Sequence, residues 1–249
     1  MTTRNAPPVG TVDGKKPAVE AMFNTIASRY DLLNRILSGG IDQRWRRRVV
    51  GDVLSTSPSR ILDVATGTAD LAIMAARKGP VNVVGVDIAE DMLAVGREKV
   101  ARADLQDRVV LQRGDAEKLP FSDNQFDAVM VSFGVRNFEN LDEGLSQIFR
   151  VLRPGGQLHV LEFSRPSAFP VKQVYGFYNR FVLPAIGRAV SGDAGAYTYL
   201  PESIAVFPEG EMFLEHLREA GFSGTRATRL TFGVASHYVG TKHQTGSSE

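Results

Sequence analysis

The chain has no cysteine among its 249 residues, and this absence excludes several kinds of site. A disulfide scaffold, a cysteine-ligated zinc or iron–sulfur centre and a cysteine nucleophile all need a residue that is missing. The absence fits a reducing cytoplasm, although a chain without cysteine is compatible with any compartment.

Long apolar runs are also missing. Residues 1–17 are rich in Pro, Gly and Thr and contain no apolar stretch of the roughly 7–15 residues that a signal peptide needs. No charge-free apolar run approaches the ~18 residues of a membrane-spanning helix. We therefore expect a cytoplasmic protein that does not span a membrane, and peripheral contact with the inner face of a membrane stays open.

The chain has little excess of charge, with 29 Lys and Arg against 28 Asp and Glu. A net charge of +1 argues against a general nucleic-acid binder, which usually has a basic domain. The balance hides an asymmetry, because the first 60 residues carry a net +5 and the remainder a net −4.

The order of apolar segments predicts one α/β domain. Apolar residues at helical spacing cover residues 18–54, and from residue 60 onward short apolar strands alternate with helices. Continuous apolar strands separated by helices indicate a doubly wound, mostly parallel sheet covered on both faces. The expected parts are a flexible start (1–17), an amino-terminal helical lid (18–54), a cofactor-binding core (60–165), an aromatic insertion (166–207), a closing helix and strands (208–240) and a flexible tail (241–249).

The insertion at residues 166–207 is unusually aromatic. It holds eight Phe and Tyr residues, including four of the six tyrosines, whereas aromatic residues make up 8% of the chain. The insertion follows the fifth predicted strand at the carboxyl edge of the sheet, where ligands of such folds bind. It could line a substrate pocket or serve only in lid or dimer packing.

The carboxyl ends of four successive predicted strands carry residues suited to a nucleoside. Asp63 begins a tight loop containing Gly67 and Thr68, which joins the first strand to a helix. Asp87 ends the second strand, where a carboxylate can accept both ribose hydroxyls. Asp115 and Ala116 follow the third strand, where an adenine could be capped, and Ser132 ends the fourth strand.

The loop lacks both the G-x-G-x-x-G pattern of dinucleotide sites and the lysine of a phosphate-binding loop. A dinucleotide or ATP is therefore disfavoured, and an adenosine ligand without phosphates, such as S-adenosylmethionine, fits better. The alternative is a purely structural turn followed by a strand-terminal aspartate.

From about residue 18 the chain resembles the C-methyltransferases of ubiquinone and menaquinone biosynthesis. The resemblance rests on MFNTIASRYDLLN at residues 22–34, continuing to Trp45, on SFGVRN at 132–137, and on RVLRPGG at 150–156 running to residue 164. Three positions depart from the family pattern: Leu33 replaces a frequent methionine, Asp42 a frequent histidine and Ala69 a usual glycine.

The resemblance implies a seven-stranded class I methyltransferase fold and S-adenosylmethionine as cofactor. The positions that match its cofactor-binding residues are Thr68, Asp87, Asp115, Ala116 and Ser132. The implied reaction is methylation of a ring carbon on a polyprenylated quinol, giving menaquinol from 2-demethylmenaquinol; a dual ubiquinone and menaquinone role is the alternative.

Arg136 is the candidate catalytic residue, because a cation near the acceptor hydroxyl could stabilise a phenolate or orient a water acting as base. Asn137 could hold a quinol oxygen. The alternative for Arg136 is a salt bridge that only fixes its loop. The candidate substrate-pocket residues are Tyr30, Asn34, Tyr178 and Tyr197, of which Tyr30 and Asn34 could instead cap and pack the lid.

No metal is expected, because His216, His237 and His243 lack the spacing of metal ligands. His159 lies in an apolar strand and is interpreted as a hydrogen-bonded core histidine. The basic run at residues 46–48 is either a solvated helix face or a contact with anionic lipid. The other functions considered are methylation of another apolar acceptor, methylation or binding of nucleic acid, and a nicotinamide oxidoreductase; a homodimer is also left open.

Overall fold

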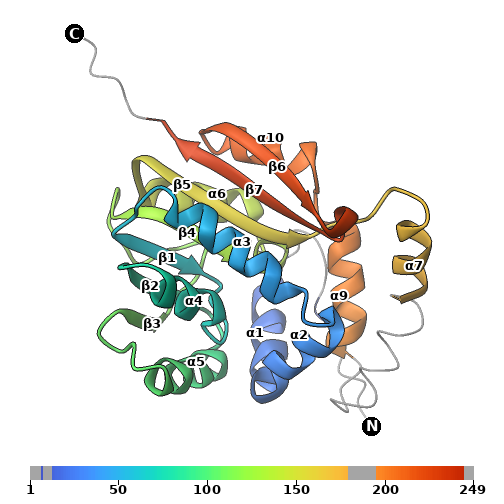
Figure 1. Cartoon of the computed structure of the whole chain (residues 1–249), viewed down its shortest axis with the longest axis horizontal. Helices are drawn as coiled ribbons and strands as arrows, with labels where there is room; N and C mark the ends of the chain where they lie inside the picture. The colour runs from blue at the N-terminus through green and yellow to red at the C-terminus, as the bar shows by residue number, and fades with distance from the viewer. Residues whose placement is uncertain (1–6, 8–12, 179–194, 244–249) are drawn as a thin grey trace.

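The computed structural model describes residue 7, residues 13–178 and residues 195–243, with the backbone only for 195–198. Its centre is a seven-stranded sheet in the order β3-β2-β1-β4-β5-β7-β6, parallel except for β7 (Figure 1). The doubly wound, mostly parallel sheet predicted from the sequence is confirmed. The strands are β1 (Arg60–Val64), β2 (Asn82–Asp87), β3 (Val109–Arg113), β4 (Phe126–Ser132), β5 (Leu152–Phe163), β6 (Phe222–Leu230) and β7 (Ala235–Lys242).

Successive residues of the central strands pack on opposite faces of the sheet, as the strand period requires. Ile61 joins the core beneath α3 (Asp42–Leu54) and α4 (Asp70–Lys78), with α5 (Glu90–Arg102) beside them. Leu62 joins the opposite core, beneath α6 (Leu141–Val151) and α10 (Glu211–Glu219). Both faces are covered, which explains why the strands read as continuous apolar runs.

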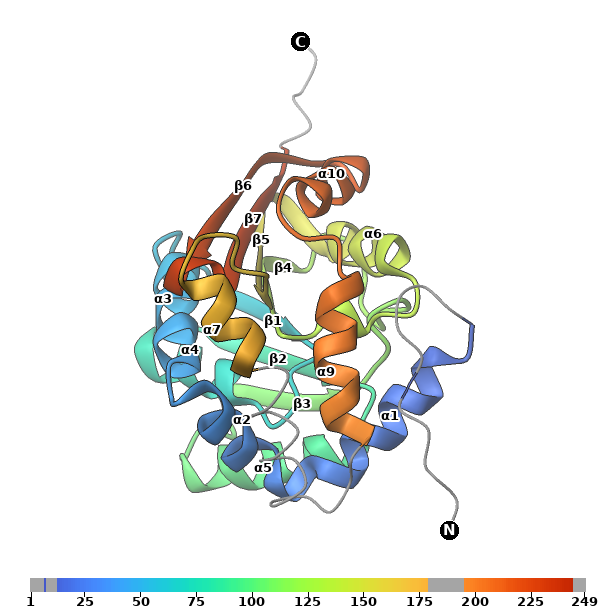
Figure 2. The same cartoon turned by 90° about the vertical axis from the view of Figure 1, so that its right-hand side faces the viewer.

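Four further helices gather at the carboxyl edge of the parallel strands (Figure 2). They are α1 (Lys15–Ile26), α2 (Tyr30–Ser38), α7 (Val171–Phe177) and α9 (Gly195–Val206). Short 3-10 turns, η1 (Ala27–Arg29), η2 (Val135–Asn137) and η4 (Thr231–Gly233), complete the described elements. The amino-terminal segment and the insertion thus meet over the same end of the sheet.

Two ends of the folded part differ from the predicted boundaries. α1 begins at Lys15, because Gly14 turns the chain with a φ of 82° and its N–H donates to Glu139 at 2.5 Å. β7 continues to Lys242, whose ammonium donates to the carbonyls of Phe149 and Leu152, both at 2.8 Å. These tertiary contacts order residues that composition alone placed in the flexible ends.

The Pro-Gly-Gly block at 154–156 lies near the start of β5, where the strand lies close to the edge of β4. A Cβ on Gly156 would lie 2.8 Å from the carbonyl oxygen of Arg153 and 2.9 Å from that of Asp127. Both obstacles are backbone atoms and cannot rotate away. Glycine is therefore required here, because a carbonyl of its own strand and one of β4 both approach its Cα closely.

Replacing Gly156 by alanine is expected to lower the free energy of unfolding by about 1–3 kcal/mol, the usual cost of overpacking. Gly176→Ala is the matched control, because its Cβ would meet nothing within 4 Å and it lies in exposed α7. Urea unfolding of both variants measures the difference. Equal midpoints would contradict the steric explanation.

Candidate functional site

A cavity of about 700 Å³, partly open to solvent, lies at the carboxyl ends of β1 to β4. This is the position where the chain crosses from the β1-β2-β3 side of the sheet to β4, the usual ligand position in doubly wound folds. Five predicted cofactor residues line it: Gly67, Asp87, Asp115, Ala116 and Ser132. The loop and strand ends predicted to converge therefore do so.

Asp87 is fixed by the loop that it faces. Its Oδ2 accepts from the Gly67 N–H at 2.8 Å, and its Oδ1 accepts from the Ala89 N–H at 2.9 Å. Burial raises the pKa of the Asp87 carboxyl, while these backbone donors favour the ionised form. The loop needs a positive φ at Gly67, 56°, which glycine adopts without strain.

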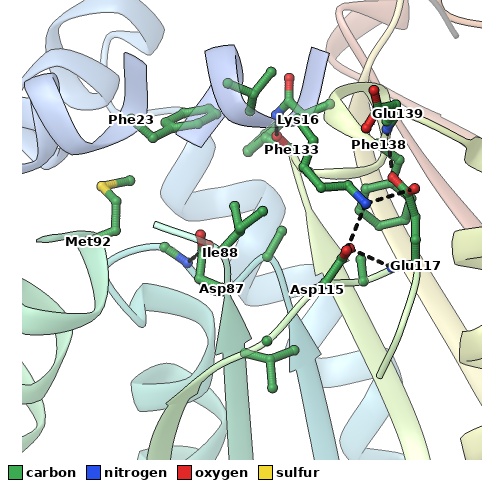
Figure 3. Close-up of a pocket in the computed structure, with 18 of the residues that line it drawn as sticks. Lys16, Phe23, Asp87, Ile88, Met92, Asp115, Glu117, Phe133, Phe138 and Glu139 are labelled. Atoms are coloured by element: carbon green, nitrogen blue, oxygen red, sulfur yellow. Dashed lines mark hydrogen bonds and ion pairs between the residues drawn. The ribbon is translucent and has the colours of Figure 1, made fainter. Parts of the chain in front are cut away.

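Asp115 lies on the wall opposite Asp87 and is paired with a lysine from α1 (Figure 3). The Lys16 ammonium lies 2.7 Å from Asp115 Oδ2 and 3.1 Å from Glu117 Oε2. The sequence analysis did not identify Lys16 or Glu117 as site residues. Only the folding of α1 across the sheet edge brings Lys16 there.

Ser132 supplies the clearest sign that the cavity receives a polar ligand. Its hydroxyl is buried and has no hydrogen-bond partner within the described structure, although it lines the cavity. Buried polar atoms normally have partners, and one left unpaired is unfavourable. An adenosine ligand fits these residues, since it carries ribose hydroxyls for Asp87 and one amino group for an acceptor near Asp115.

Thr68 and Asp63, also predicted to bind the cofactor, do not line this cavity. The Thr68 hydroxyl donates to Asp31 Oδ1 at 2.6 Å and accepts from Lys99. Asp63 lies beneath the loop and accepts from the Thr66 hydroxyl at 2.6 Å. Burial raises the pKa of Asp63 to about 7. Because Asp63 and Thr68 make their hydrogen bonds outside the cavity, both residues support the loop from the side away from the cavity.

A second, larger cavity of about 1290 Å³ adjoins the first. Phe23, Tyr30 and Phe133 line both, so the two spaces meet at these aromatic rings. Phe133 holds a φ of 59°, a strained value for a large side chain. Other residues of the second cavity are mostly apolar: Met22, Ile26, Leu33, Leu37, Ile41, Trp45, Phe163, Tyr175, Leu200, Ile204 and Val234.

Arg136 lines the second cavity and is buried with a carboxylate. Its Nη1 lies 2.8 Å from Glu162 Oε1 and donates to the Phe133 carbonyl at 2.6 Å. Its Nε has no hydrogen-bond partner in the described chain. Burial raises the pKa of Glu162, and the Arg136 charge opposes that rise. The salt bridge considered as the alternative role is present, and it leaves one donor uncommitted.

Asn137 lines the first cavity, and its Oδ1 accepts from the Tyr199 hydroxyl at 3.1 Å. Burial raises the pKa of Tyr199 to about 12, so this hydroxyl stays protonated. Tyr178 lines the second cavity and donates to the Leu37 carbonyl at 2.7 Å, and Asn34 lines it too. The Tyr197 side chain lies outside the described residues.

The histidine prediction holds for His159, which is fully buried and lies 3.2 Å from His237 and from Gln157. Burial lowers the pKa of His159 to about 3 and that of His237 to about 4. Neither lines either of the two cavities described above. In the described part of the chain, no group of three or more His, Asp or Glu residues is placed to hold a metal ion.

The sequence analysis missed Asp42, Arg46 and Phe133 as site residues. From the sequence, Asp42 was interpreted as a departure from the family pattern, and Arg46 as part of a basic run. Both residues are buried and line the second cavity. Their spacing of four residues on a predicted helix was the available signal. Phe133 stands next to Ser132, and its strained turn was not readable from the sequence.

A family model described as the ubiE/COQ5 methyltransferase family matches residues 11–242. A demethylmenaquinone methyltransferase of Deinococcus radiodurans is 49% identical over 243 residues, which cover 97% of this chain and all of that protein. A ubiquinone/menaquinone biosynthesis C-methyltransferase of Geobacter sulfurreducens is 45% identical over 92% of this chain and 90% of that protein. A solved S-adenosylmethionine-dependent methyltransferase of Thermotoga maritima shares the fold, with a TM-score of 0.63, 19% identity, and coverage of 89% of this chain and 98% of that one. The chain belongs to the ubiE/COQ5 methyltransferase family.

Proposed function

We propose that the chain transfers a methyl group from S-adenosylmethionine to a ring carbon of a polyprenylated quinol, converting 2-demethylmenaquinol to menaquinol. The observation that carries the proposal is the junction, at Phe23, Tyr30 and Phe133, of a cavity that contains charged side chains with a larger, mostly apolar one. The names of the relatives, which specify demethylmenaquinone or ubiquinone/menaquinone methylation, support the same acceptor.

The cofactor-binding residues in this proposal are Gly67, Asp87, Asp115 and Ser132. When bound, S-adenosylmethionine supplies a methyl group already activated on a sulfonium. The chain's task is then to hold the acceptor in line and exclude water. The apolar wall of the second cavity suits that task.

Arg136 acts on the acceptor in this proposal. A phenol pKa near ~10 leaves little anion at neutral pH. The buried Arg136 guanidinium favours the ionised hydroxyl, and Glu162 keeps it in place at 2.8 Å. Tyr199, which lines the second cavity, and Asn137, which lines the first, are hydrogen-bonded to each other and supply further polar groups. Tyr199 is no base, since its pKa is about 12.

A membrane contact next to the second cavity is the finer part of the proposal. α2 and α7 present exposed apolar side chains, Leu32, Ile36, Val174 and Phe177, which we call the apolar rim. The Tyr178 hydroxyl bonds the Leu37 carbonyl, so the two helices lie together at the cavity. No helix in the described part of the chain is long and apolar enough to span a membrane. A polyprenyl acceptor would reach the cavity across this rim.

The direct test gives purified protein labelled S-adenosylmethionine with reduced demethylmenaquinone or with a methoxy-benzoquinol. Label is expected in the naphthoquinol. Label in both acceptors would assign the dual role. Label in neither, together with methylation of RNA, would replace the proposal with the nucleic-acid alternative.

Asp87→Ala is expected to weaken S-adenosylmethionine binding at least tenfold, since removing a charged hydrogen-bond acceptor costs about 1.5–3 kcal/mol. Asp107→Ala, at an exposed carboxylate, is the control. Calorimetric titration measures both. Unchanged affinity for Asp87→Ala would remove Asp87 from the cofactor site.

The double variant Ile36→Gln/Phe177→Gln is expected to lower binding to anionic phospholipid vesicles at least tenfold, because each buried apolar side chain contributes about 1.5–3 kcal/mol. Met212→Gln is the control, since Met212 is similarly exposed on α10, away from α2 and α7 (Figures 1 and 2). Co-sedimentation measures binding. Equal binding of the double variant and the control would exclude the apolar rim as the contact.

A further inference from the structure

Arg46 is a buried cation in the second cavity with an uncommitted donor. It comes from α3, and 7% of its side chain is exposed. Its Nε lies 3.5 Å from Asp42 Oδ2, an ion-pair distance, but makes no hydrogen bond to the described chain. A buried guanidinium that lines a cavity and still has an N–H without an acceptor suits an oxygen atom of a ligand.

Arg46 and Arg136 are arranged alike around one aromatic pair. The rings of Phe133 and Phe163 stack with centroids 4.4 Å apart. The Arg46 guanidinium carbon lies 5.3 Å from the Phe133 centroid, and that of Arg136 lies 5.5 Å from the Phe163 centroid. Both guanidinium groups keep an Nε without a hydrogen-bond partner in the described chain. The second cavity is therefore lined by two buried guanidinium groups, each packed on one ring of a stacked aromatic pair.

Each cation is balanced by its own carboxylate. Asp42 pairs with Arg46, and Glu162 pairs with Arg136. Asp63 also interacts with the Arg46 charge from beneath the loop. Asp42 is itself held, because its Oδ1 accepts from the Ser38 hydroxyl at 2.7 Å. Asp42 thus positions Arg46, while the Nε is left for another acceptor.

A hydroquinone has two oxygens at opposite positions of its ring, and this pattern matches two separate donors. We propose that Arg46, positioned by Asp42, binds the acceptor oxygen para to the oxygen at Arg136, so that the site selects rings with two opposed oxygens. This rests on the quinol methyltransferase function proposed above. Arg46 is a substrate-binding residue in this assignment, and Asp42 is a positioning residue.

The test compares two soluble acceptors with the same short prenyl chain. One is a 1,4-dihydroxynaphthalene; the other lacks the hydroxyl para to the one beside the methylated carbon. Methyl transfer to the diol gives kcat and KM, and competitive inhibition gives the affinity of the monohydroxy analogue, which therefore need not react. S-adenosylmethionine affinity and thermal melting report whether each variant is folded.

Arg46→Gln is expected to lower kcat/KM for the diol about 10- to 100-fold, the range for losing a charged hydrogen bond. Affinity for the monohydroxy analogue should change less than about threefold, because that ligand has no oxygen at Arg46. Arg47→Gln on the same helix is the matched control, since Arg47 is exposed and bonds only its own helix carbonyl at Gln43 among the contacts described. It should leave both quantities unchanged.

Asp42→Asn/Arg46→Gln removes both charges, so that neither is left buried alone if the single variant fails to fold. The same selective loss on the diol is expected. Equal losses on both ligands would show a merely structural role and overturn the assignment. If the wild-type protein does not methylate the diol, the proposed function itself is overturned. If the wild-type protein is active but the Arg46 variant does not lose the diol selectively over the monohydroxy analogue, only the assignment of Arg46 is overturned.

Discussion

The buried ion pair between Arg136 and Glu162 fixes the loop after β4, and that loop carries residues of both cavities. Glu162 is fully buried on β5, and Arg136 stands in the turn after β4. Removing one partner of such a pair leaves a buried charge alone and costs about 3–5 kcal/mol. The Lys15 ammonium reaches the same turn and donates to the carbonyls of Arg136 and Phe138, at 2.9 and 2.7 Å. The first helix, the loop after β4 and the fifth strand are thereby fixed together, and the loop carries residues of both cavities.

This connection also explains why the amino-terminal helices belong to the site. Burial lowers the pKa of Lys15 to about 8, because its charge is held away from water. Lys16, the next residue, pairs with Asp115 and Glu117 in the nucleoside cavity. α1 is thus attached to the sheet edge by two neighbouring cations. Phe23, on the same helix, then lies where the two cavities meet.

The sequence predicted the sheet, and it predicted that several of the residues lining the first cavity would converge, for a physical reason. Parallel strands end at one edge, so Asp87, Asp115 and Ser132 could be brought together from strand order alone. The direction of individual side chains in the loop could not be predicted. The Thr68 hydroxyl bonds Asp31 and the Asp63 carboxylate bonds Thr66, and neither residue lines the first cavity. The spacing of residues along the chain does not reveal these hydrogen bonds.

The second cavity was harder to predict, because it is built from segments far apart in the chain. Tyr30, Asn34 and Tyr178, which the resemblance and the aromatic content predicted as substrate-pocket residues, line this cavity. Asp42 and Arg46 were not, since a charged pair on a helix ordinarily faces water. Their burial depends on α3 crossing above Phe133, a contact between distant segments.

The charge asymmetry of the sequence therefore has two physical origins. Arg46 is buried with Asp42, and Lys16 lines the first cavity and pairs with Asp115, so part of the amino-terminal positive charge balances carboxylates inside the protein. Lys15 is also buried, and its ammonium donates to backbone carbonyls. Arg35, Arg44 and Arg47 are exposed on α2 and α3, and Arg35 lies beside the apolar rim. Interior cations act at short range and are little screened, whereas exposed ones weaken with salt. Ionic strength should thus affect any contact of the outer arginines with an anionic surface far more than it affects the architecture of the two cavities.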